Sequence, residues 1–416
     1  MKVCVIGLGY IGLPTAAMLA LEKYKVVGID INKKVIDAIY DGKVHFFEPE
    51  LENILEHALK GGNLRCSIEP EQADVFLITV PTPNTKSRKA DLSAIHDAIL
   101  GIGPLLIEGN LIILESTSSV GTTENITSML QQIRPELKFP VYGTEGSDVD
   151  VHIAYCPERV LPGRILEELI TNDRIVGGVT ATCALKAERF YSSFVKGNCV
   201  VTDSRTAELC KLSENAFRDV NIAFANELST ICDKHNIDVW ELVRLANHHP
   251  RVDILQPGPG VGGHCIAVDP WFIIESAPAE SILIKTAREI NDNRPNVVFA
   301  RIQDSVESLG RDVSDLVIAC FGLSFKRDVD DFRGSPAVDV VEKVLKEGFK
   351  DVMLVEPHLK HILPGKQFSS ARLVDSVEAL QHADILVLLV DHEEFRTLDT
   401  RLRKAAIVID TRGIWN

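Results

Sequence analysis

The segment that decides the fold reads VCVIGLGYIGLPTAAMLALEKYKVVGID and covers residues 3–30. A β-branched apolar run leads into the glycine turn Gly7-Leu8-Gly9-Tyr10-Ile11-Gly12, and a helical stretch comes next. A second apolar run, residues 26–29, ends on Asp30. Strand, glycine turn, helix and strand in this order predict a βαβ unit at the start of a parallel sheet.

The glycine turn also suggests a ligand. GxGxxG by itself is a weak signal, and a tight turn followed by an incidental Asp30 is the alternative interpretation. In this context the glycines let the backbone approach a pyrophosphate at the helix N-terminus, and the acid accepts hydrogen bonds from ribose hydroxyls. Because a carboxylate at position 30 repels a 2′-phosphate, the pattern favours NAD over NADP, although Lys33 and Lys34 weaken that preference slightly.

Strand and helix patterns continue to alternate up to about residue 203, which indicates a doubly wound sheet. The expected strands are 75–80, 111–114, 153–155 and 174–177, and the expected helices are 92–102 and 122–133.

The middle and the end of the chain differ from each other. Between 204 and 247 apolar residues recur at helical spacing, which predicts a long helix and a second one. The last third repeats the N-terminal order, with one strand running into Gly322, the next ending on Glu356, and two more at 385–390 and 407–409. We therefore expect an α/β protein in which a helical central domain joins two Rossmann-like, doubly wound parallel-sheet domains. The expected boundaries are 1–203, 204–308 and 309–416.

Composition excludes several classes of protein. The 416 residues are 45% apolar, which is enough for packed cores and rules out a disordered chain. With 44 basic and 59 acidic residues the net charge is −15, so nucleic acid and anionic lipid are unlikely partners. No apolar run approaches the roughly 18 to 20 residues of a membrane helix, and the glycines at 7, 9 and 12 argue against a secretory signal.

The nine cysteines are odd in number and widely spaced, without a CxxC pair or zinc-like spacing. They indicate reduced thiols in a cytoplasmic protein, and no metal site is expected. A free cysteine is usually a small buried apolar residue. Cys265 stands apart because it comes just after the glycine-rich stretch 257–263, where a substrate can approach a nucleophile. A structural and a functional role both stay open from its local sequence.

Lys211, Asn215 and Arg218 share one face of the predicted long helix. They form either a solvated stripe or a site for an oxyanion or phosphate. Thr117 and the segment 157–159 come after predicted strands, at the edge where ligands of such sheets bind, although each could be ordinary loop chemistry.

Several motifs, spread over essentially the whole chain, resemble the UDP-glucose/GDP-mannose dehydrogenase family. They are GLGYIGLP at 7–14, PTP at 81–83, EST at 115–117, PER at 157–159, KLSENAFRD at 211–219, GPGVGGHCIAVDPWF at 258–272, FGLSFK at 321–326 and DDFRGSP at 330–336. The resemblance implies a homodimeric enzyme with an N-terminal NAD domain, a helical dimerisation domain and a C-terminal domain that binds UDP. It further implies oxidation of a nucleotide-sugar C6 alcohol to a carboxylate with two NAD.

The resemblance also assigns residue roles. The implied catalytic residues are Cys265 as nucleophile, Lys211 and Asn215 as oxyanion stabilisers, Thr117 and Asp269 as holders of a water, and Glu158 as an aid to hydrolysis. The implied NAD-binding residues are Gly7, Gly9, Tyr10, Ile11, Gly12, Asp30, Thr82, Thr117, Arg333 and Arg412. The implied substrate-binding residues are Arg159, Val160, Lys211, Asn215, Arg218, His249, Arg251, Gly262, Phe325 and Lys326, with Arg251 reaching the neighbouring subunit's site.

The loop around Cys265 resembles the N-acetylhexosamine branch of the family. It reads GGHCIAVD at 262–269, whereas the glucose branch typically has GGSCFPKD. The resemblance therefore favours UDP-N-acetyl-D-mannosamine as substrate, for a surface polysaccharide such as enterobacterial common antigen. UDP-N-acetylglucosamine and UDP-glucose are the alternatives. Two other classes also stay open, a one-step β-hydroxyacid dehydrogenase and a non-catalytic nucleotide sensor; NADH formed per sugar separates them from a two-step enzyme.

Overall fold

The computed structural model describes residues 1–46, 48–85, 87–144, 148–161, 163–359, 368–399, 405 and 407–415. They form two compact units. The first unit is Met1–Glu214 with Trp271–Ala277, and the second is Asn215–Pro270 with Pro278–Asn416.

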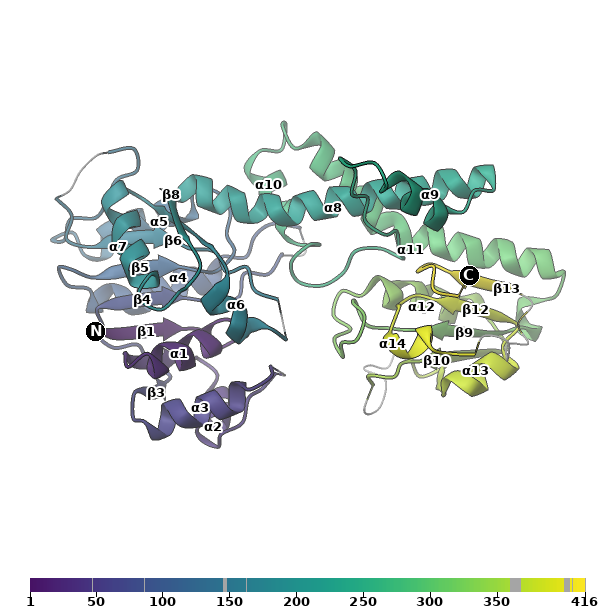
Figure 1. Cartoon of the computed structure of the whole chain (residues 1–416), viewed down its shortest axis with the longest axis horizontal. Helices are drawn as coiled ribbons and strands as arrows, with labels where there is room; N and C mark the ends of the chain where they lie inside the picture. The colour runs from purple at the N-terminus through teal and green to yellow at the C-terminus, as the bar shows by residue number, and fades with distance from the viewer. Residues whose placement is uncertain are drawn as a thin grey trace. The chain divides into compact units, whose positions relative to one another are not determined.

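The first unit is built on a sheet of eight strands in the order β3-β2-β1-β4-β5-β6-β7-β8 (Figure 1). Neighbouring strands are parallel except β6 and β7, which are antiparallel. The elements are β1 (Lys2–Ile6), α1 (Gly12–Leu21), β2 (Lys25–Ile29), α2 (Lys33–Tyr40), α3 (Leu51–Lys60), β3 (Leu64–Ser67), β4 (Val75–Ile78), α4 (Ser93–Ile102), η1 (Gly103–Leu105), β5 (Leu111–Leu114), α5 (Thr122–Ile133), β6 (His152–Tyr155), α6 (Ile165–Thr171), β7 (Arg174–Gly178), α7 (Ala181–Tyr191) and β8 (Cys199–Asp203).

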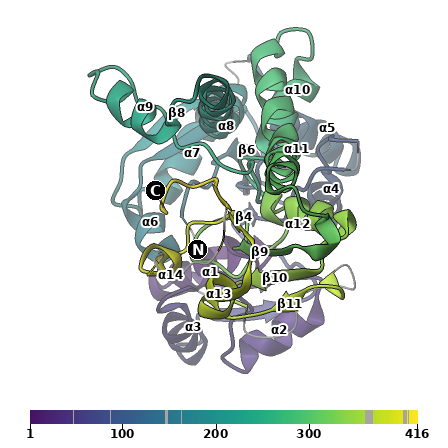
Figure 2. The same cartoon turned by 90° about the vertical axis from the view of Figure 1, so that its right-hand side faces the viewer.

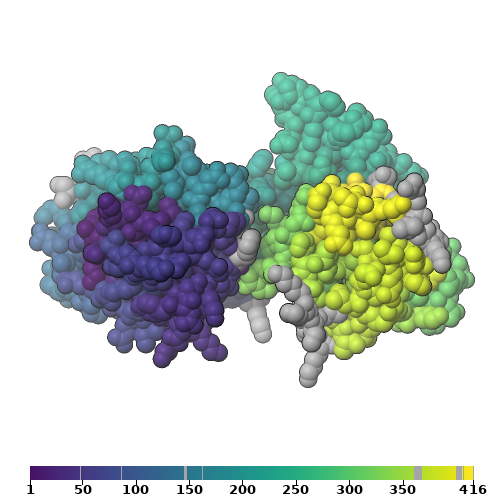
Figure 3. Space-filling model, turned by 60° about the horizontal axis from the view of Figure 1, so that its bottom comes forward, coloured from purple at the N-terminus to yellow at the C-terminus, as the bar shows by residue number. Residues whose placement is uncertain are grey.

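Helices cover both faces of this sheet. Successive side chains of a strand point to opposite faces, so Val3 and Val5 pack against α1, α3 and α7. Cys4 and Ile6 pack against α4 and α5 on the other face. Strands β4 and β5 are apolar at every position, as expected for a buried parallel sheet. The unit's residues pack into one continuous body in the space-filling view (Figure 3).

The second unit contains a sheet of five parallel strands in the order β11-β10-β9-β12-β13. Figure 1 labels β10, β9, β12 and β13, and Figure 2 labels β11 together with β10 and β9. Helices α11 and α12 cover one face, whereas α13 and α14 cover the other. The elements are η2 (Val313–Asp315), β9 (Val317–Phe321), α12 (Pro336–Glu347), β10 (Asp351–Val355), β11 (Arg372–Leu373), α13 (Ser376–His382), β12 (Ile385–Leu388), α14 (Glu393–Arg396) and β13 (Ile407–Asp410).

The middle of the chain is helical. It consists of α8 (Ser204–His235), α9 (Val239–Ala246), α10 (Asp269–Ser276) and α11 (Ile282–Leu309). Within the second unit, buried Arg288 on α11 pairs with buried Asp219 on α8 at 2.6 Å. Asn291 donates to the same carboxylate at 2.8 Å. A buried charge that is paired and hydrogen-bonded in this way fixes which faces of two helices meet.

The predicted fold class is confirmed, with two sheets of Rossmann-like order and a helical centre. The sheet is not parallel throughout, because β7 reverses direction against β6. The sequence pattern also failed to predict several short elements, among them β3, β8 and α10. No helix in the described part of the chain is long and apolar enough to cross a membrane. The three domain boundaries stay a prediction.

Candidate active site

The glycine turn between β1 and α1 leaves space for a ligand. Gly7 has φ +94°, and a Cβ on Gly12 would lie 1.8 Å from the Gly7 carbonyl oxygen, so neither position accepts a side chain. A Cβ on Gly9, in contrast, would meet no described atom within 4 Å. Ile11 at the N-cap of α1 provides no side-chain hydrogen bond to the first turn. The backbone amides of this helix N-terminus therefore suit an anion such as a pyrophosphate.

Asp30 lies beside this turn, just after β2. One carboxylate oxygen accepts the N–H of Leu8 at 3.1 Å and the other accepts the N–H of Asn32 at 2.8 Å. These two bonds fix the carboxylate next to the glycine turn, as recognition of the ribose hydroxyls requires. The exposed ring of Tyr10 packs on Phe46 with centroids 4.3 Å apart. The residues of the turn thus fit NAD.

The carboxyl ends of the neighbouring strands carry further predicted residues. Thr82 comes after β4 and Thr117 after β5, and both are half-buried. Glu158 comes after β6 and forms an ion pair with Arg174 at 3.1 Å, with side chains only 9% and 5% exposed. Because burial makes an unpaired charge costly, the pairing with Arg174 holds the Glu158 side chain in place. Sequence reasoning missed Arg174, whose position in a strand looked merely structural.

Two neighbours of Glu158 in sequence are also fixed within the first unit. Arg159 pairs with Glu214 at 2.9 Å. Val160 packs against an apolar cluster that includes Met18 and Ile165.

A second buried acid, Glu115, also escaped sequence reasoning. It comes directly after β5 and accepts a hydrogen bond from the Tyr191 hydroxyl at 2.5 Å. Burial raises the pKa of this carboxyl to about 7, against the opposing charge of Arg174. Its position directly after an all-apolar strand was the sequence signal that could have indicated Glu115 as a buried acid.

In the second unit the structure brings two predicted catalytic residues together. The Asn215 side-chain amide donates to a carboxylate oxygen of Asp269 at 2.6 Å, and the residues are 8% and 3% exposed. They are 54 positions apart in the sequence. Arg218, further along α8, is exposed, while half-buried Lys211 lies one turn before Asn215 on the same helix.

The glycine-rich stretch before Cys265 is anchored to the central helices. The N–H of Gly258 donates to Asn226 at 2.9 Å, and its carbonyl accepts from Arg294 at 2.9 Å. Cys265 comes after this anchored stretch, and its carbonyl accepts the N–H groups of Val268 and Asp269, each at 2.9 Å. The thiol is therefore presented just before α10 begins.

Cys265 differs from the other cysteines in exposure. All nine lie in the described part of the chain, and Cys265 is the exposed one. Burial raises the pKa of the thiols of Cys4, Cys66, Cys156 and Cys320 to about 12. Such thiols are poor nucleophiles at neutral pH, so accessibility singles out Cys265.

The glycine-rich stretch also meets predicted substrate-binding residues of the C-terminal sheet. A Cβ on Gly262 would lie 2.4 Å from the carbonyl oxygen of Gly334 and 3.1 Å from Cβ of Phe325. Gly262 and Phe325 are therefore adjacent, with Lys326 exposed beside them in the sequence. His249 and Arg251 are exposed after α9, where a ring nitrogen of His249 accepts the Arg251 N–H at 3.3 Å.

The two arginines expected near NAD each pair with an acid of their own unit. Arg333 pairs with Asp331 at 2.8 Å, and Arg412 pairs with Asp391 at 2.8 Å. Their role toward NAD stays a prediction.

The class of protein that these features indicate is an NAD-dependent dehydrogenase. The features are a glycine turn that suits a pyrophosphate, an acid fixed beside it, an accessible thiol and a buried amide–carboxylate pair. Three models of the UDP-glucose/GDP-mannose dehydrogenase family match the chain: the NAD binding domain at residues 1–195, the central domain at 205–293 and the UDP binding domain at 319–416. The chain belongs to this family.

Individual relatives agree with the family assignment. The chain is 53% identical to an NDP-N-acetyl-D-galactosaminuronic acid dehydrogenase of Ralstonia nicotianae, over 100% of this chain and 96% of that protein. It is 50% identical to the UDP-N-acetyl-D-mannosamine dehydrogenase of Escherichia coli, over 99% of both. Among solved structures, the UDP-D-ManNAc dehydrogenase of Pyrococcus horikoshii superposes with a TM-score of 0.89 at 38% identity, covering 100% of this chain and 96% of that one.

Proposed function

We propose that this protein oxidises the C6 alcohol of UDP-N-acetyl-D-mannosamine to the carboxylate. The observation that carries the proposal is the exposed thiol of Cys265 shortly before Asp269, whose buried carboxylate accepts a hydrogen bond from Asn215. The 50% identity to the E. coli UDP-N-acetyl-D-mannosamine dehydrogenase over nearly full length supports this choice of sugar. The loop sequence at 262–269 supports it independently. We further propose that the product serves synthesis of a surface polysaccharide, such as enterobacterial common antigen.

The chemistry requires a nucleophile because the alcohol is oxidised twice. NAD supplies the oxidising power by accepting one hydride at each oxidation. The Cys265 sulfur adds to the aldehyde carbon after the first oxidation and forms a thiohemiacetal, which keeps the aldehyde from escaping. The second oxidation leaves a thioester. Water then adds to the thioester carbon, and the C–S bond breaks to release the carboxylate and the free thiol.

The other residues that the resemblance implies assist these steps in our proposal. Asn215 and Lys211 donate hydrogen bonds to the tetrahedral oxyanions, where preorganised donors contribute most. Asp269 and Thr117 hold a water near C6, and Glu158 assists the hydrolysis. Sugar and nucleotide contacts are assigned to residues that the covalent step does not need: Arg159, Val160, Arg218, His249, Gly262, Phe325 and Lys326.

A second sugar is favoured by a specific observation. The relative from Ralstonia nicotianae, at 53% identity, is named an NDP-N-acetyl-D-galactosaminuronic acid dehydrogenase. UDP-N-acetylgalactosamine is therefore the second candidate, and it retains the same covalent chemistry.

The long helix α8 provides a reason to propose a homodimer. Phe217, Phe224 and Ile231 repeat every seven residues and are 68%, 50% and 46% exposed. This spacing places them on one stripe of the helix, and an exposed apolar stripe marks an interaction surface.

Replacing Phe224 with Glu should convert the dimer to a monomer in sedimentation analysis. Arg251→Ala should reduce UDP-sugar affinity without changing the dimer mass, as expected if Arg251 reaches the neighbouring site.

A substrate panel tests the choice of sugar. It comprises UDP-N-acetylmannosamine, UDP-N-acetylgalactosamine, UDP-N-acetylglucosamine, UDP-glucose and GDP-mannose, with NADH formation as the readout. We expect the highest kcat/KM with UDP-N-acetylmannosamine and two NADH per sugar. One NADH per sugar would contradict the two-step mechanism, and no NADH would contradict enzymatic activity.

Replacing Cys265 with Ser tests the covalent step. Serine is the weaker nucleophile and its ester is less reactive than a thioester, so turnover should nearly stop while NAD affinity is retained. Mass spectrometry after incubation with sugar and NAD should then reveal whether an adduct accumulates. Cys199→Ser, a half-exposed thiol on β8, is the matched control and should keep full activity. Near wild-type NADH production by Cys265→Ser would exclude covalent catalysis at this position.

A further inference from the structure

A buried carboxylate joins two elements of the first unit that carry predicted catalytic residues. Glu208 lies near the start of α8, is 0% exposed and has no role in the chemistry described above. One of its carboxylate oxygens accepts the backbone N–H of Gly121 at 2.6 Å. The other accepts the backbone N–H of Thr123 at 2.8 Å and the Thr123 hydroxyl at 2.6 Å. Glu208 therefore caps the N-terminus of α5 from another helix (Figure 1).

Helix α5 receives no side-chain cap from its own N-cap residue. That residue is Gly121, whose φ of +93° is a left-handed conformation that glycine adopts without strain. The first turn of a helix leaves backbone N–H groups without partners, and its partial positive charge favours an anion. The Glu208 carboxylate meets both requirements from 87 positions further along the chain. The N-terminus of α5 is thus complete only when α8 packs against it.

The loop that leads into α5 carries Thr117, and this loop is anchored on both sides of that residue. Before Thr117, the Ser116 hydroxyl donates to the carbonyl oxygen of Val80 at 2.7 Å. After Thr117, the N–H of Gly121 is held by Glu208. The carboxylate of Glu208 therefore fixes the second end of the Thr117 loop to α8.

The same carboxylate lies one turn before Lys211 on α8. The two residues are three positions apart, so they are neighbours on the surface of the helix. Glu208 consequently ties the loop of Thr117, which holds a water in the proposed mechanism, to the helical turn of the oxyanion donor Lys211. Both residues act on the same carbon in that mechanism. A displacement of about 1 Å is enough to lower the rate of such a reaction about 100-fold.

An exposed ion pair links the same two helices. Two guanidinium nitrogens of Arg205 on α8 lie 2.5 and 2.8 Å from the carboxylate oxygens of Glu124 on α5. The Arg205 side chain is 52% exposed, and an ion pair of this kind contributes little to stability because water can replace it. Water does not reach Glu208, so each hydrogen bond lost there leaves a buried polar group without a partner. Of the two links, the buried one fixes the geometry.

We propose that Glu208 is a positioning residue for catalysis, which fixes the loop of Thr117 to the helix of Lys211 so that both reach the same carbon. The inference rests on the proposed function, because the roles of Thr117 and Lys211 belong to it. Glu208 acts through these two residues and takes no part in the covalent steps. Its loss should therefore lower kcat, whereas the KM for the UDP-sugar should stay nearly unchanged.

Glu208→Gln tests the proposal with almost no change in side-chain volume. The amide has one acceptor oxygen where the carboxylate has two, so a backbone N–H at the start of α5 loses its acceptor. We expect kcat to fall at least about tenfold. Because hydrolysis of the thioester needs both the water and the oxyanion donor, mass spectrometry during turnover should detect a sugar adduct on Cys265. A protein that is merely destabilised would not accumulate this adduct.

Thr123→Val is a second, milder variant for the case that Glu208→Gln does not fold by circular dichroism. It removes the hydroxyl that donates to Glu208 and keeps both backbone hydrogen bonds. We expect a smaller fall in kcat than for Glu208→Gln, again with a nearly unchanged KM for the UDP-sugar.

Two control variants separate positioning from stability. Arg205→Gln breaks the exposed link between the same helices and should keep the wild-type kcat. Ile126→Val removes a methylene from a buried residue of α5 and should lower the melting temperature without changing kcat.

The outcomes distinguish this inference from the proposed function. Wild-type protein that forms no NADH with any UDP-sugar would overturn the proposed function and this inference with it. Active wild-type protein with a near wild-type kcat in Glu208→Gln and Thr123→Val would overturn this inference alone. An equal fall of kcat in Glu208→Gln and Ile126→Val, without a sugar adduct, would also overturn it, because Glu208 would then serve stability only.

Discussion

The two sheets of this protein begin alike and then diverge. Gly7 and Gly322 both come after the first strand of their sheet with positive φ, +94° and +87°. Each donates its N–H to the last residue of the second strand, Ile29 or Val355, at 2.8 and 2.9 Å. The next residue, Leu8 or Leu323, donates to the acid just beyond that strand. The order β3-β2-β1-β4-β5 in the first sheet also matches the order β11-β10-β9-β12-β13 in the second. Both cores are therefore built around the same arrangement of five parallel strands.

The difference lies in the segment between this glycine and the next helix. Five residues, 7–11, separate β1 from α1, whereas fourteen, 322–335, separate β9 from α12. The first turn leaves the helix N-terminus without a side-chain cap, whereas Ser335 caps α12 by accepting the Ala337 N–H at 3.2 Å. The second acid, Glu356, is buried against His392. The helix N-terminus of the first sheet is therefore open to a ligand, whereas that of α12 in the second sheet is closed by its own Ser335 cap.

The largest effect is expected for Gly12→Ala in the first sheet. Its Cβ would lie 1.8 Å from the Gly7 carbonyl oxygen, which must move and distort the pyrophosphate cradle. We expect NAD affinity to fall at least about 100-fold, or ~2.7 kcal/mol, in fluorescence titration. Gly101→Ala on α4, where the Cβ meets only the Pro70 side chain at 3.5 Å, is the control. Unchanged NAD affinity in Gly12→Ala would show that the turn is not the cradle.

The counterpart in the second sheet is Gly322→Ala. The position has φ +87°, and its Cβ would lie 2.4 Å from Cβ of Val390. Strain and overpacking should lower the free energy of unfolding by about 2 kcal/mol. NAD affinity should stay at the wild-type value because the cradle is in the other sheet. A loss of NAD affinity with an intact fold would refute this separation of roles.

Asp30→Asn should give a smaller loss. The amide keeps the shape of the side chain but removes the charge that suits a ribose diol and repels a 2′-phosphate. NAD affinity should fall about tenfold, or ~1.4 kcal/mol, and the preference for NAD over NADP should narrow in kcat/KM. Asp37→Asn, on the exposed side of α2, should change neither value. Equal use of NADP by the unmodified protein would contradict the role of Asp30.

The smallest expected effect is a pH dependence of folding stability. It concerns the residues directly after the corresponding strands β5 and β13 of the two sheets. Glu115 comes after β5, whereas neutral Thr411 comes after the corresponding β13. Because the folded-state pKa of Glu115 is raised to about 7, the folded state holds an extra proton between about pH 4.5 and 7. Stability from this group is therefore full at low pH and declines as pH rises through 7, by about 1 kcal/mol between pH 6 and 8. Thermal unfolding of Glu115→Gln should show a weaker decline over this range; an unchanged decline would exclude Glu115 as its source.

Local pattern was sufficient for most of the fold. The runs at 111–114 and 317–321 match the observed strands residue for residue, because buried parallel strands are apolar throughout. The reversal of β7 was not predictable, since pairing direction depends on partners distant in sequence. Strand β8 was missed because its apolar run, residues 199–201, is short and is followed directly by the polar residues Thr202 and Asp203.

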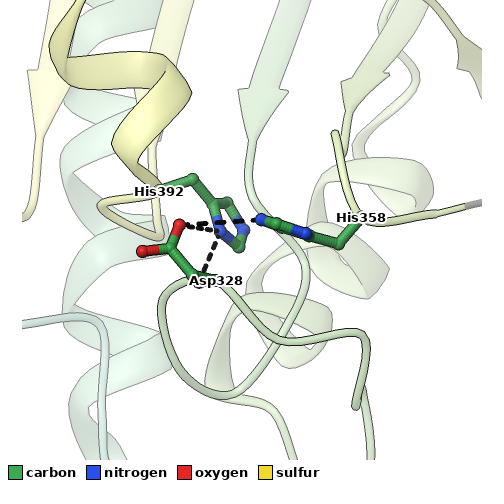
Figure 4. Close-up of side chains that lie close together, drawn as sticks. All are labelled: Asp328, His358 and His392. Atoms are coloured by element: carbon green, nitrogen blue, oxygen red, sulfur yellow. Dashed lines mark hydrogen bonds and ion pairs between the residues drawn. The ribbon is translucent and has the colours of Figure 1, made fainter. Parts of the chain in front are cut away.

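The sequence allowed the residues of the candidate site to be named, but it did not allow the contacts between them to be predicted. Asn215 and Asp269 were named separately, but their hydrogen bond joins positions 54 apart. Arg174 was missed because its partner Glu158 is recognised only once β6 and β7 are paired. The proximity of Asp328, His358 and His392 (Figure 4) was not predictable for the same reason. No short spacing links three residues that lie after three different strands.

The anchoring of Gly258 has a consequence for how this enzyme can change over generations. Both polar groups of that residue are bonded to the central helices, through Asn226 and Arg294. The path of the backbone toward Cys265 thus depends on residues of the central helices. His264, Ile266 and Ala267 flank the thiol without providing this anchor, so their side chains can drift under selection for a new sugar while the nucleophile keeps its place. Within this one loop, the anchored Gly258 keeps the nucleophile in place, whereas the residues beside the thiol are free to change with the substrate.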